Sequence, residues 1–391
     1  MTTPPPPTPA VYPNSGETSE QWYWDGTQWT EYPITQLAGP PAREPAPQAQ
    51  QARDPLRRTG KRSPLARILG IAAALTVIGT VVFAAVHRQF PPYLVPPAYL
   101  VTATVHLDRN VKDVAVDPVT HTVYATNWHE DTVTVIDGST HRVTATVPAG
   151  KDPRSVAVDP NTHTVYVANE FENSVSVIDG STRAVIATVH IGGIPVALAV
   201  DPDSQSVYVA IFDDDSIRVI DGKTHEVSAT VPVGKGPYGV AVDPITHTVY
   251  AANRDEDTVS VIDASTRTVT ATVHVGKAPD ALAMDPGIHT VYVSHEGGDS
   301  VSLIDETTHT VTATVHVGRG GDAVAVDPGT HTVYVANYRD GTVSVIDGSK
   351  RRVAATVRVG SMPYGLAVDP STHTVYVANY GDGTVSVIEP R

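Results

Sequence analysis

The chain has 391 residues, carries a formal net charge of −15 and contains no cysteine. Its length predicts more than one structural part. The absence of cysteine excludes disulfides, thiolate metal sites and cysteine nucleophiles. Most of the negative charge lies in residues 91–391, which hold 19 basic and 36 acidic residues. Such an acidic body repels phosphate backbones, so nucleic acid is not an expected partner.

Residues 1–67 form a proline-rich tail without apolar periodicity. A segment of this kind buries too little apolar surface to offset its chain entropy, so we predict a disordered tail. One island, residues 21–33, reads "QWYWDGTQWTEYP" and holds three of the four tryptophans of the chain. It resembles the second half of a short "RYWDGxxWT" module at the N-termini of many bacterial, chiefly actinobacterial, membrane proteins. Two interpretations stay open: a small element that docks a cytoplasmic partner, or aromatic residues in a flexible tail.

Residues 68–86 form an uncharged apolar run, "ILGIAAALTVIGTVVFAAV". As a helix this run spans about 28 Å, enough to cross the core of a bilayer. Basic residues are much denser before the run than after it, which predicts a signal anchor in the plasma membrane with a cytoplasmic N-terminus. A cleaved signal peptide fits poorly, because the preceding segment is long and no small-residue cleavage site follows. A buried core helix is the alternative.

Residues 87–99 include "QFPPYLVPPAY" and predict a proline-rich tether. In an extended polyproline conformation such a tether reaches about 30 Å. The part of the chain that follows is therefore expected close to the outer surface of the membrane.

Residues 100–391 are self-similar. The aspartate of a "VDP" motif recurs with a constant interval at Asp117, Asp159, Asp201, Asp243, Asp285, Asp327 and Asp369. A period of about 40 to 50 residues, with short Val- and Thr-rich runs between turn signals, is typical of propeller blades with four strands each. In the first repeat we expect strands at 114–117, 121–127, 132–137 and 141–149, joined by "DPxTH" and "DGSTH" turns. The fold class is therefore all-β, a seven-bladed propeller.

The second strand of the repeats carries the stretch "YATN" at Tyr124 and "YVAN" at Tyr166, Tyr334 and Tyr376. These residues resemble the YVTN group of bacterial and archaeal propellers, which includes surface-layer and periplasmic proteins. Related seven-bladed folds include lactonases and streptogramin lyases, so the resemblance implies a fold and leaves the function open.

The last repeat ends after its third strand, whereas "YLVTATVHL" near residue 100 matches a fourth strand with no repeat before it. If this N-terminal strand completes the last blade, the ring is closed by ladder hydrogen bonds and no unpaired edge is left there. We predict that residues 100–107 are the outer strand of the seventh blade.

The position before each predicted first strand is expected to line the top mouth of the central channel. In chain order it is occupied by Lys112, Arg154, Val196, Tyr238, Asp280, Asp322 and Tyr364. The loops between second and third strands belong to the same face, and they are rich in acidic and aromatic residues. From these loops and strand ends we add Trp128, His129, Phe212, His295, Tyr338 and Tyr380 to the candidate ligand-binding residues.

Several interpretations of these top residues stay open. They could form a polar funnel for an extended peptide, a glycan or a small zwitterion, in which aromatic residues supply contact area. They could instead be solvated turn residues whose charges pair between blades. A Ca²⁺ site in the acidic loops is a third alternative, although no spacing matches a known cation loop, and no metal or other cofactor is expected.

Six histidines recur at one turn position, at His121, His163, His247, His289, His331 and His373, with Gln205 in the remaining blade. A residue repeated by the blade pattern is expected to be a turn residue. No linear catalytic motif is present, so we assign no catalytic residue. The prediction is a non-catalytic binding or scaffolding module of the cell envelope, with a protein, peptide or glycan ligand at its top face. A membrane-tethered enzyme of the lyase or lactonase type is the alternative.

Overall fold

The computed structural model describes residues 20–24, 29–33, 99–107, 110–296 and 298–390. The chain divides into two compact units, Met1–Val86 and His87–Arg391. In the first unit β1 (Glu20–Trp24) and β2 (Trp29–Pro33) pair antiparallel within the Trp-rich island. Among the described residues, no helix is long and apolar enough to span a bilayer. The span predicted at 68–86, the tether up to residue 98 and the rest of the tail lie outside the described residues.

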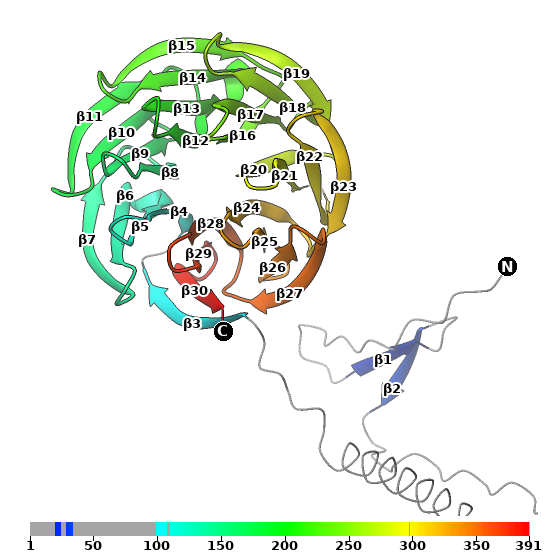
Figure 1. The fold of residues 1–391 in the computed structure, drawn as a ribbon. Coiled ribbons are helices and arrows are strands. Elements are labelled where there is room, and N and C mark those ends of the chain that lie inside the picture. Colours follow the sequence, from blue (N-terminus) through cyan, green and yellow to red (C-terminus); the bar gives the residue numbers. More distant parts are fainter. Residues whose placement is uncertain (1–19, 25–28, 34–98, 108–109, 297, 391) are drawn as a thin grey trace, which may run out of the picture. The chain divides into compact units, whose positions relative to one another are not determined.

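The second unit is a ring of seven antiparallel sheets with four strands each, arranged around a central channel (Figure 1). The sheets follow one another in chain order, and within each sheet neighbouring strands are consecutive in sequence, except in the blade that closes the ring. The all-β prediction of a seven-bladed propeller is therefore confirmed.

The first strand of each blade lies next to the channel. These inner strands are β4 (Val111–Asp117), β8 (Pro153–Asp159), β12 (Pro195–Asp201), β16 (Pro237–Val242), β20 (Pro279–Asp285), β24 (Gly321–Asp327) and β28 (Pro363–Asp369). The second strands are β5 (Thr122–Asn127), β9 (Thr164–Asn169), β13 (Ser206–Ile211), β17 (Thr248–Asn253), β21 (Thr290–His295), β25 (Thr332–Asn337) and β29 (Thr374–Asn379).

The third and fourth strands complete each blade toward the outside. The third strands are β6 (Thr132–Asp137), β10 (Ser174–Asp179), β14 (Ser216–Asp221), β18 (Thr258–Asp263), β22 (Ser300–Asp305), β26 (Thr342–Asp347) and β30 (Thr384–Pro390). The outer strands are β7 (Arg142–Pro148), β11 (Ala184–His190), β15 (Glu226–Pro232), β19 (Thr268–His274), β23 (Thr310–His316), β27 (Arg352–Arg358) and β3 (Tyr99–His106).

The inner strand of the first blade begins three residues earlier than predicted. Its register against β5 shifts between Val111, which faces Asn127, and Val114, which faces Ala125. This irregularity is a β-bulge, which hides the alternation that marks a strand in the sequence. The earlier start of β4 places Lys112 within the strand, at the end of the channel where the inner strands begin. We call this end the mouth and the opposite end the bottom.

The core lies between neighbouring blades. One apolar cluster joins Val105 and Val385 of the seventh blade to Val123 and Ile136 of the first, and all four side chains are buried. The same contact repeats around the ring, because alternate residues of each strand point to opposite faces of the sheet and both faces are covered by a neighbour. Each buried valine or isoleucine contributes about 1.5–3 kcal/mol relative to an exposed one.

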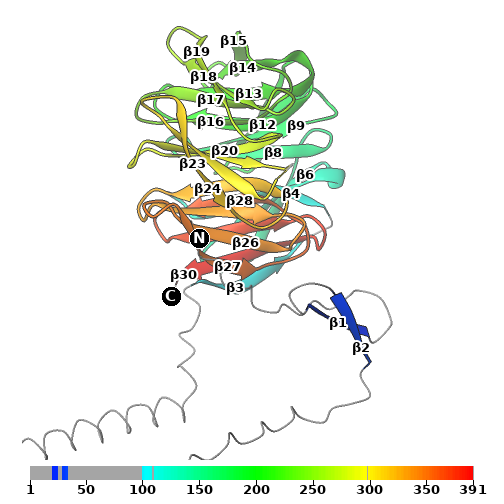
Figure 2. The same ribbon diagram turned by 90° about the vertical axis from the view of Figure 1, so that its right-hand side faces the viewer.

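The ring is closed by its N-terminal strand. β3 pairs antiparallel with β30, with Tyr99 opposite Pro390 and His106 opposite Thr384. Figures 1 and 2 both show β3 beside β30, although most of the chain separates them in sequence. The predicted closure is confirmed, and the strand starts one residue earlier than expected.

Candidate binding site at the channel mouth

Bonds between blades define the bottom of the ring. The Nδ1–H of His163 donates to the carboxylate of Asp117 in the preceding blade over 2.7 Å, and His121 does the same to Asp369 across the closure of the ring. Three more histidines bond the preceding blade in the same way: His247, His331 and His373. Each of these aspartates is almost completely buried, and its second oxygen accepts backbone N–H groups of its own turn, as Asp117 does from Val119.

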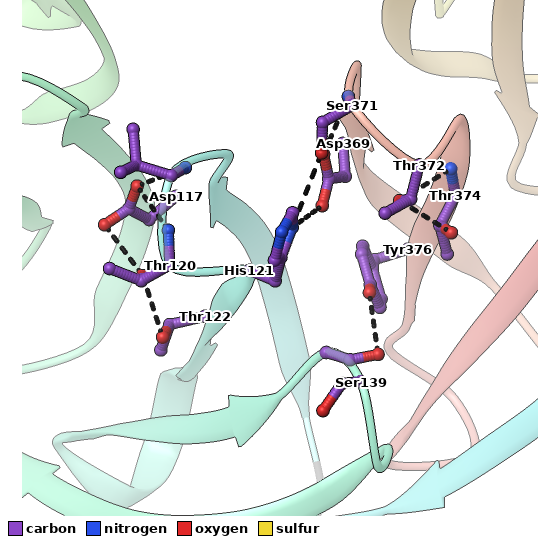
Figure 3. Close-up of polar contacts among 12 residues, drawn as sticks. Asp117, Thr120, His121, Thr122, Ser139, Asp369, Ser371, Thr372, Thr374 and Tyr376 are labelled. Carbon is purple, nitrogen blue, oxygen red and sulfur yellow. Dashed lines mark hydrogen bonds and ion pairs between the residues drawn. The ribbon is translucent and has the colours of Figure 1, made fainter.

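Figure 3 shows the bond at the closure, where His121 reaches Asp369 while Tyr376 points to the first blade. The Tyr376 hydroxyl donates to the carbonyl of Gly138. A Cβ at residue 138 would lie 2.7 Å from this hydroxyl, so a larger residue there would require the tyrosine to shift. The repeated histidines are thus turn residues, as predicted. Five of them also connect neighbouring blades, which sequence reasoning missed, whereas His289 bonds Glu306 of its own blade.

Most acidic side chains of the top loops serve the backbone. Asp131 accepts the N–H of Asp152, Asp257 that of Ala278 and Asp382 that of Ser361, and each bond joins a loop of one blade to a connection between consecutive blades. These carboxylates satisfy N–H groups that no strand pairs. Within the part of the chain that the structure describes, no group of three or more His, Asp or Glu residues could hold a metal ion.

Arg154 spans the mouth of the channel. Its Nη2 donates to the hydroxyls of Tyr238 and Tyr364, which belong to the fourth and seventh blades, and the second of these bonds measures 3.2 Å. Its Nη1 donates to Glu170 over 3.2 Å. The side chain is 8% exposed, so one guanidinium from the second blade connects three blades across the opening.

Lys112 lies beside Arg154 within a group of aromatic rings. Its Nζ is 3.7 Å from the ring centroid of Tyr364, 4.4 Å from that of Trp128 and 5.3 Å from that of Tyr380. Such faces attract a cation through their quadrupole. Burial, with the charge of Arg154, lowers the pKa of Lys112 to about 8. Trp128 is held here because it begins a 3₁₀ turn, η1 (Trp128–Glu130), that ends at Asp131 in the left-handed conformation.

Asp280 and Asp322 supply the opposite charge, and both are more than nine-tenths buried. The two carboxyl groups lie close enough for each to shift the pKa of the other. Burial raises the pKa of each, and for Asp322 the neighbouring charge of Asp280 raises it further. Oδ1 of Asp280 has no hydrogen-bond partner among the described residues.

A cavity of about 230 Å³ lies at this end of the channel, lined by Arg154, Tyr238, Asp280, Asp322 and Tyr364. Small residues widen it, because these five side chains and Val196 are each followed by a small residue: Ser155, Ala197, Gly239, Ala281, Ala323 or Gly365. The first blade has Asp113 there. That carboxylate accepts the N–H of Val156 and the hydroxyl of Ser155, and burial raises its pKa to about 6. Sequence reasoning missed this residue, although it breaks the small-residue pattern.

The remaining predicted residues divide into two groups. Phe212 packs edge-on against Tyr238 at 5.9 Å, and Tyr338 packs edge-on against Tyr364 at 6.0 Å, so both border the mouth. His129 stacks on Trp128 and bonds Asp152, and it is half-exposed at the rim.

His295 lies apart from this mouth group, because its side chain is 1% exposed and bonds Ser302 over 2.8 Å. Burial lowers its pKa to about 4. It takes the position of Asn127 and Asn169 in other blades, whose amides donate to Thr and Ser hydroxyls of the third strand. That register was visible in the sequence.

Comparisons with known proteins agree with this fold. Residues 98–255 match a family model described as a YNCE-like beta-propeller. Over these residues the chain resembles such propellers. Among solved structures, hydrazine synthase of Kuenenia stuttgartiensis is similar with a TM-score of 0.66 and 22% sequence identity, over 73% of this chain and 97% of that one. At this identity the likeness concerns the fold alone. No curated protein matches the chain.

Proposed function

We propose that this protein is a non-catalytic binding or scaffolding module whose ligand sits over the channel mouth. One observation carries the proposal: Lys112, Arg154, Asp280 and Asp322 come from four different blades, converge on one opening, and are each more than nine-tenths buried. Burying charge is costly, and the fold does not require it, because Val196 occupies the same ring position in the third blade. Costly departures from a repeat are expected where a protein binds its ligand.

The aromatic rim favours a ligand with extended contact area. Trp128, Tyr338, Tyr380 and Phe212 surround the charged centre and suit a protein segment, a peptide or a glycan. The full chain, immobilised and dialysed against an extract of the producing cells' envelope, should retain a compound identifiable by mass spectrometry. Retention should fall at least about tenfold when Lys112→Ala, Arg154→Ala, Asp280→Asn and Asp322→Asn are combined. The exposed Asp299→Asn, in the same blade as Asp280, is the matched control, and equal retention by all three proteins would reject the proposal.

We also propose that the module is held outside the cell by a single plasma-membrane span at residues 68–86, with the N-terminus in the cytoplasm and available to a cytoplasmic partner. This part of the proposal rests on the uncharged run and on the basic residues before it.

An enzyme is the second candidate, because shifted pKa values gather at active sites. Lys112, with a pKa of about 8, and the raised carboxyl pair could exchange protons near neutral pH. A lyase or lactonase would transform the retained compound during dialysis, and Lys112→Met would then stop turnover while binding persists. Recovery of the compound unchanged supports the binding module.

A further inference from the structure

We propose that the buried carboxyl pair formed by Asp280 and Asp322 binds a small organic cation with a primary ammonium head. This inference rests on the proposed function and names the chemistry that one part of that site recognises. It starts from the cavity of about 230 Å³, in which Oδ1 of Asp280 lies without a donor from the described residues. Asp280 is 5% exposed, so this oxygen has lost bulk water without gaining a protein partner.

The cations around the pair are already engaged elsewhere. Arg154 bonds Glu170, Tyr238 and Tyr364. Arg254 pairs with Glu296 and lies 4.4 Å from the ring centroid of Tyr238. Lys112 lies over the ring of Tyr364. None of these three donates to Oδ1 of Asp280, so the acceptor is left for a ligand.

The other carboxylate in the cavity is also engaged. Asp113 accepts two backbone N–H groups, from Val114 and Val156, and the hydroxyl of Ser155. The unsatisfied acceptor in the cavity is therefore Oδ1 of Asp280, which can accept a hydrogen bond from a ligand. A donor that carries positive charge can stabilise both carboxylates at once, whereas a neutral hydroxyl leaves the shared proton in place.

The proposed binding exchanges one proton for one ammonium ion, so the charge balances. In the proposed exchange the free pair carries one proton, the bound pair is doubly ionised, and the proton passes to solvent as the ammonium enters. The groups facing the pair are the cations Lys112, Arg154 and Arg254 and the phenols Tyr338 and Tyr364. The carboxyl pair, with raised pKa values, and Lys112, with a lowered one, are the groups among them expected to change charge near neutral pH, and only the pair releases a proton when a cation binds.

Isothermal titration of the full chain tests the inference. Ethanolamine supplies a primary ammonium, whereas tetramethylammonium has the same charge and no N–H donor. We expect ethanolamine to bind with release of up to one proton, measured in two buffers of different ionisation enthalpy. Its affinity should rise by up to about tenfold per pH unit while the pair is protonated. Asp280→Asn should lower the affinity by about tenfold or more, and Asp299→Asn should not change it.

Three results would overturn the inference: no binding of ethanolamine, equal binding of tetramethylammonium, or unchanged binding by Asp280→Asn. If Asp280→Asn does not fold, Asp322→Asn and the proton release of the wild-type chain answer the same question. If ethanolamine fails while the dialysed compound still depends on Lys112 and Arg154, the ammonium is rejected and the binding function stands. If neither is bound, both fail.

Discussion

His121 and Gln205 occupy the same turn position in different blades, and both have the left-handed backbone, with φ of 54° and 53°. His121 bonds Asp369 across the junction of two blades, whereas the side chain of Gln205 makes no hydrogen bond among the described residues. At the junction of Gln205 the equivalent acceptor is Asp159, which is 2% exposed and caps its own turn through Asn161. These two positions allow the contribution of one inter-blade bond to stability to be measured twice, by removing the bond at residue 121 and by adding it at residue 205.

We predict that His121→Gln lowers the free energy of unfolding by about 1 kcal/mol, because a bond to a buried carboxylate is lost. Gln205→His should raise it by a similar amount, since the new imidazole can reach Asp159. Chemical denaturation of both variants measures the change. A Gln205→His variant no more stable than the wild type would show that the repeated histidines do not stabilise the ring.

Replacing Asp322 is expected to raise the free energy of unfolding, whereas replacing His121 is expected to lower it. In the folded chain its pKa lies above the ordinary carboxyl value, so the folded state holds a proton that the unfolded state has released. The resulting penalty is absent below the unfolded pKa, sets in as pH rises above about 4, and is complete above the raised folded pKa. Asp322→Asn removes it.

We therefore expect Asp322→Asn to be more stable than the wild type by about 1–3 kcal/mol at pH 9, with little difference near pH 4. Melting curves across this pH range measure the effect, with Asp299→Asn as the control. A gain that does not depend on pH would contradict a buried carboxyl group with a raised pKa.

At the scale of elements, the closing strand is the part of the fold with the longest sequence separation. β3 contributes one fully inward side chain, Val105, to the core between the last and first blades, while Thr104 beside it is exposed. We predict that Val105→Ala costs about 1–3 kcal/mol and that Thr104→Ala costs less than about 0.5 kcal/mol. Equal melting temperatures for the two variants would mean that the strand does not latch the ring.

The sequence predicts the elements because the 42-residue interval between motifs, as from Asp117 to Asp159, places every blade in one register. It also predicts Lys112, Arg154, Asp280 and Asp322 at one mouth, because equal positions in equal blades lie on one circle. The bonds between blades are harder to predict. His163 and Asp117 are 46 residues apart, and nothing in the sequence says that a turn residue reaches its neighbour.

Hydrogen bonds from loop backbone N–H groups to acidic side chains are equally hard to predict from the sequence. The acidic residues of the top loops suggest a charged surface, but Asp131, Asp257 and Asp382 accept backbone N–H groups of the connections between blades. Only three-dimensional placement separates these carboxylates from the pair at the mouth, which has no backbone to cap. This distinction matters because the carboxylates that accept backbone N–H groups are not available to a ligand. The candidate site is therefore the small charged group at the mouth and not the whole acidic face.

At the scale of the whole molecule, the proposed anchor has a direct test. A reporter that is active only outside the cytoplasmic membrane should be active when fused after Arg391 and inactive when fused after Pro33, because basic residues before the span hold the N-terminus inside. A reporter active after Pro33 alone would reverse the proposed orientation. With Tyr99 and Pro390 paired at one end of the closing blade, both ends of the propeller lie near the bottom of the ring.

The central claim is that the channel mouth is a ligand site assembled from separate blades. A structure of the full chain bound to the compound retained in dialysis tests it most directly. We predict the ligand over the cavity, with a donor within hydrogen-bonding distance of Oδ1 of Asp280 and aromatic contact to Trp128 or Tyr380. A ligand on the outer strands, or on the bottom beside His121 and Asp369, would contradict the claim.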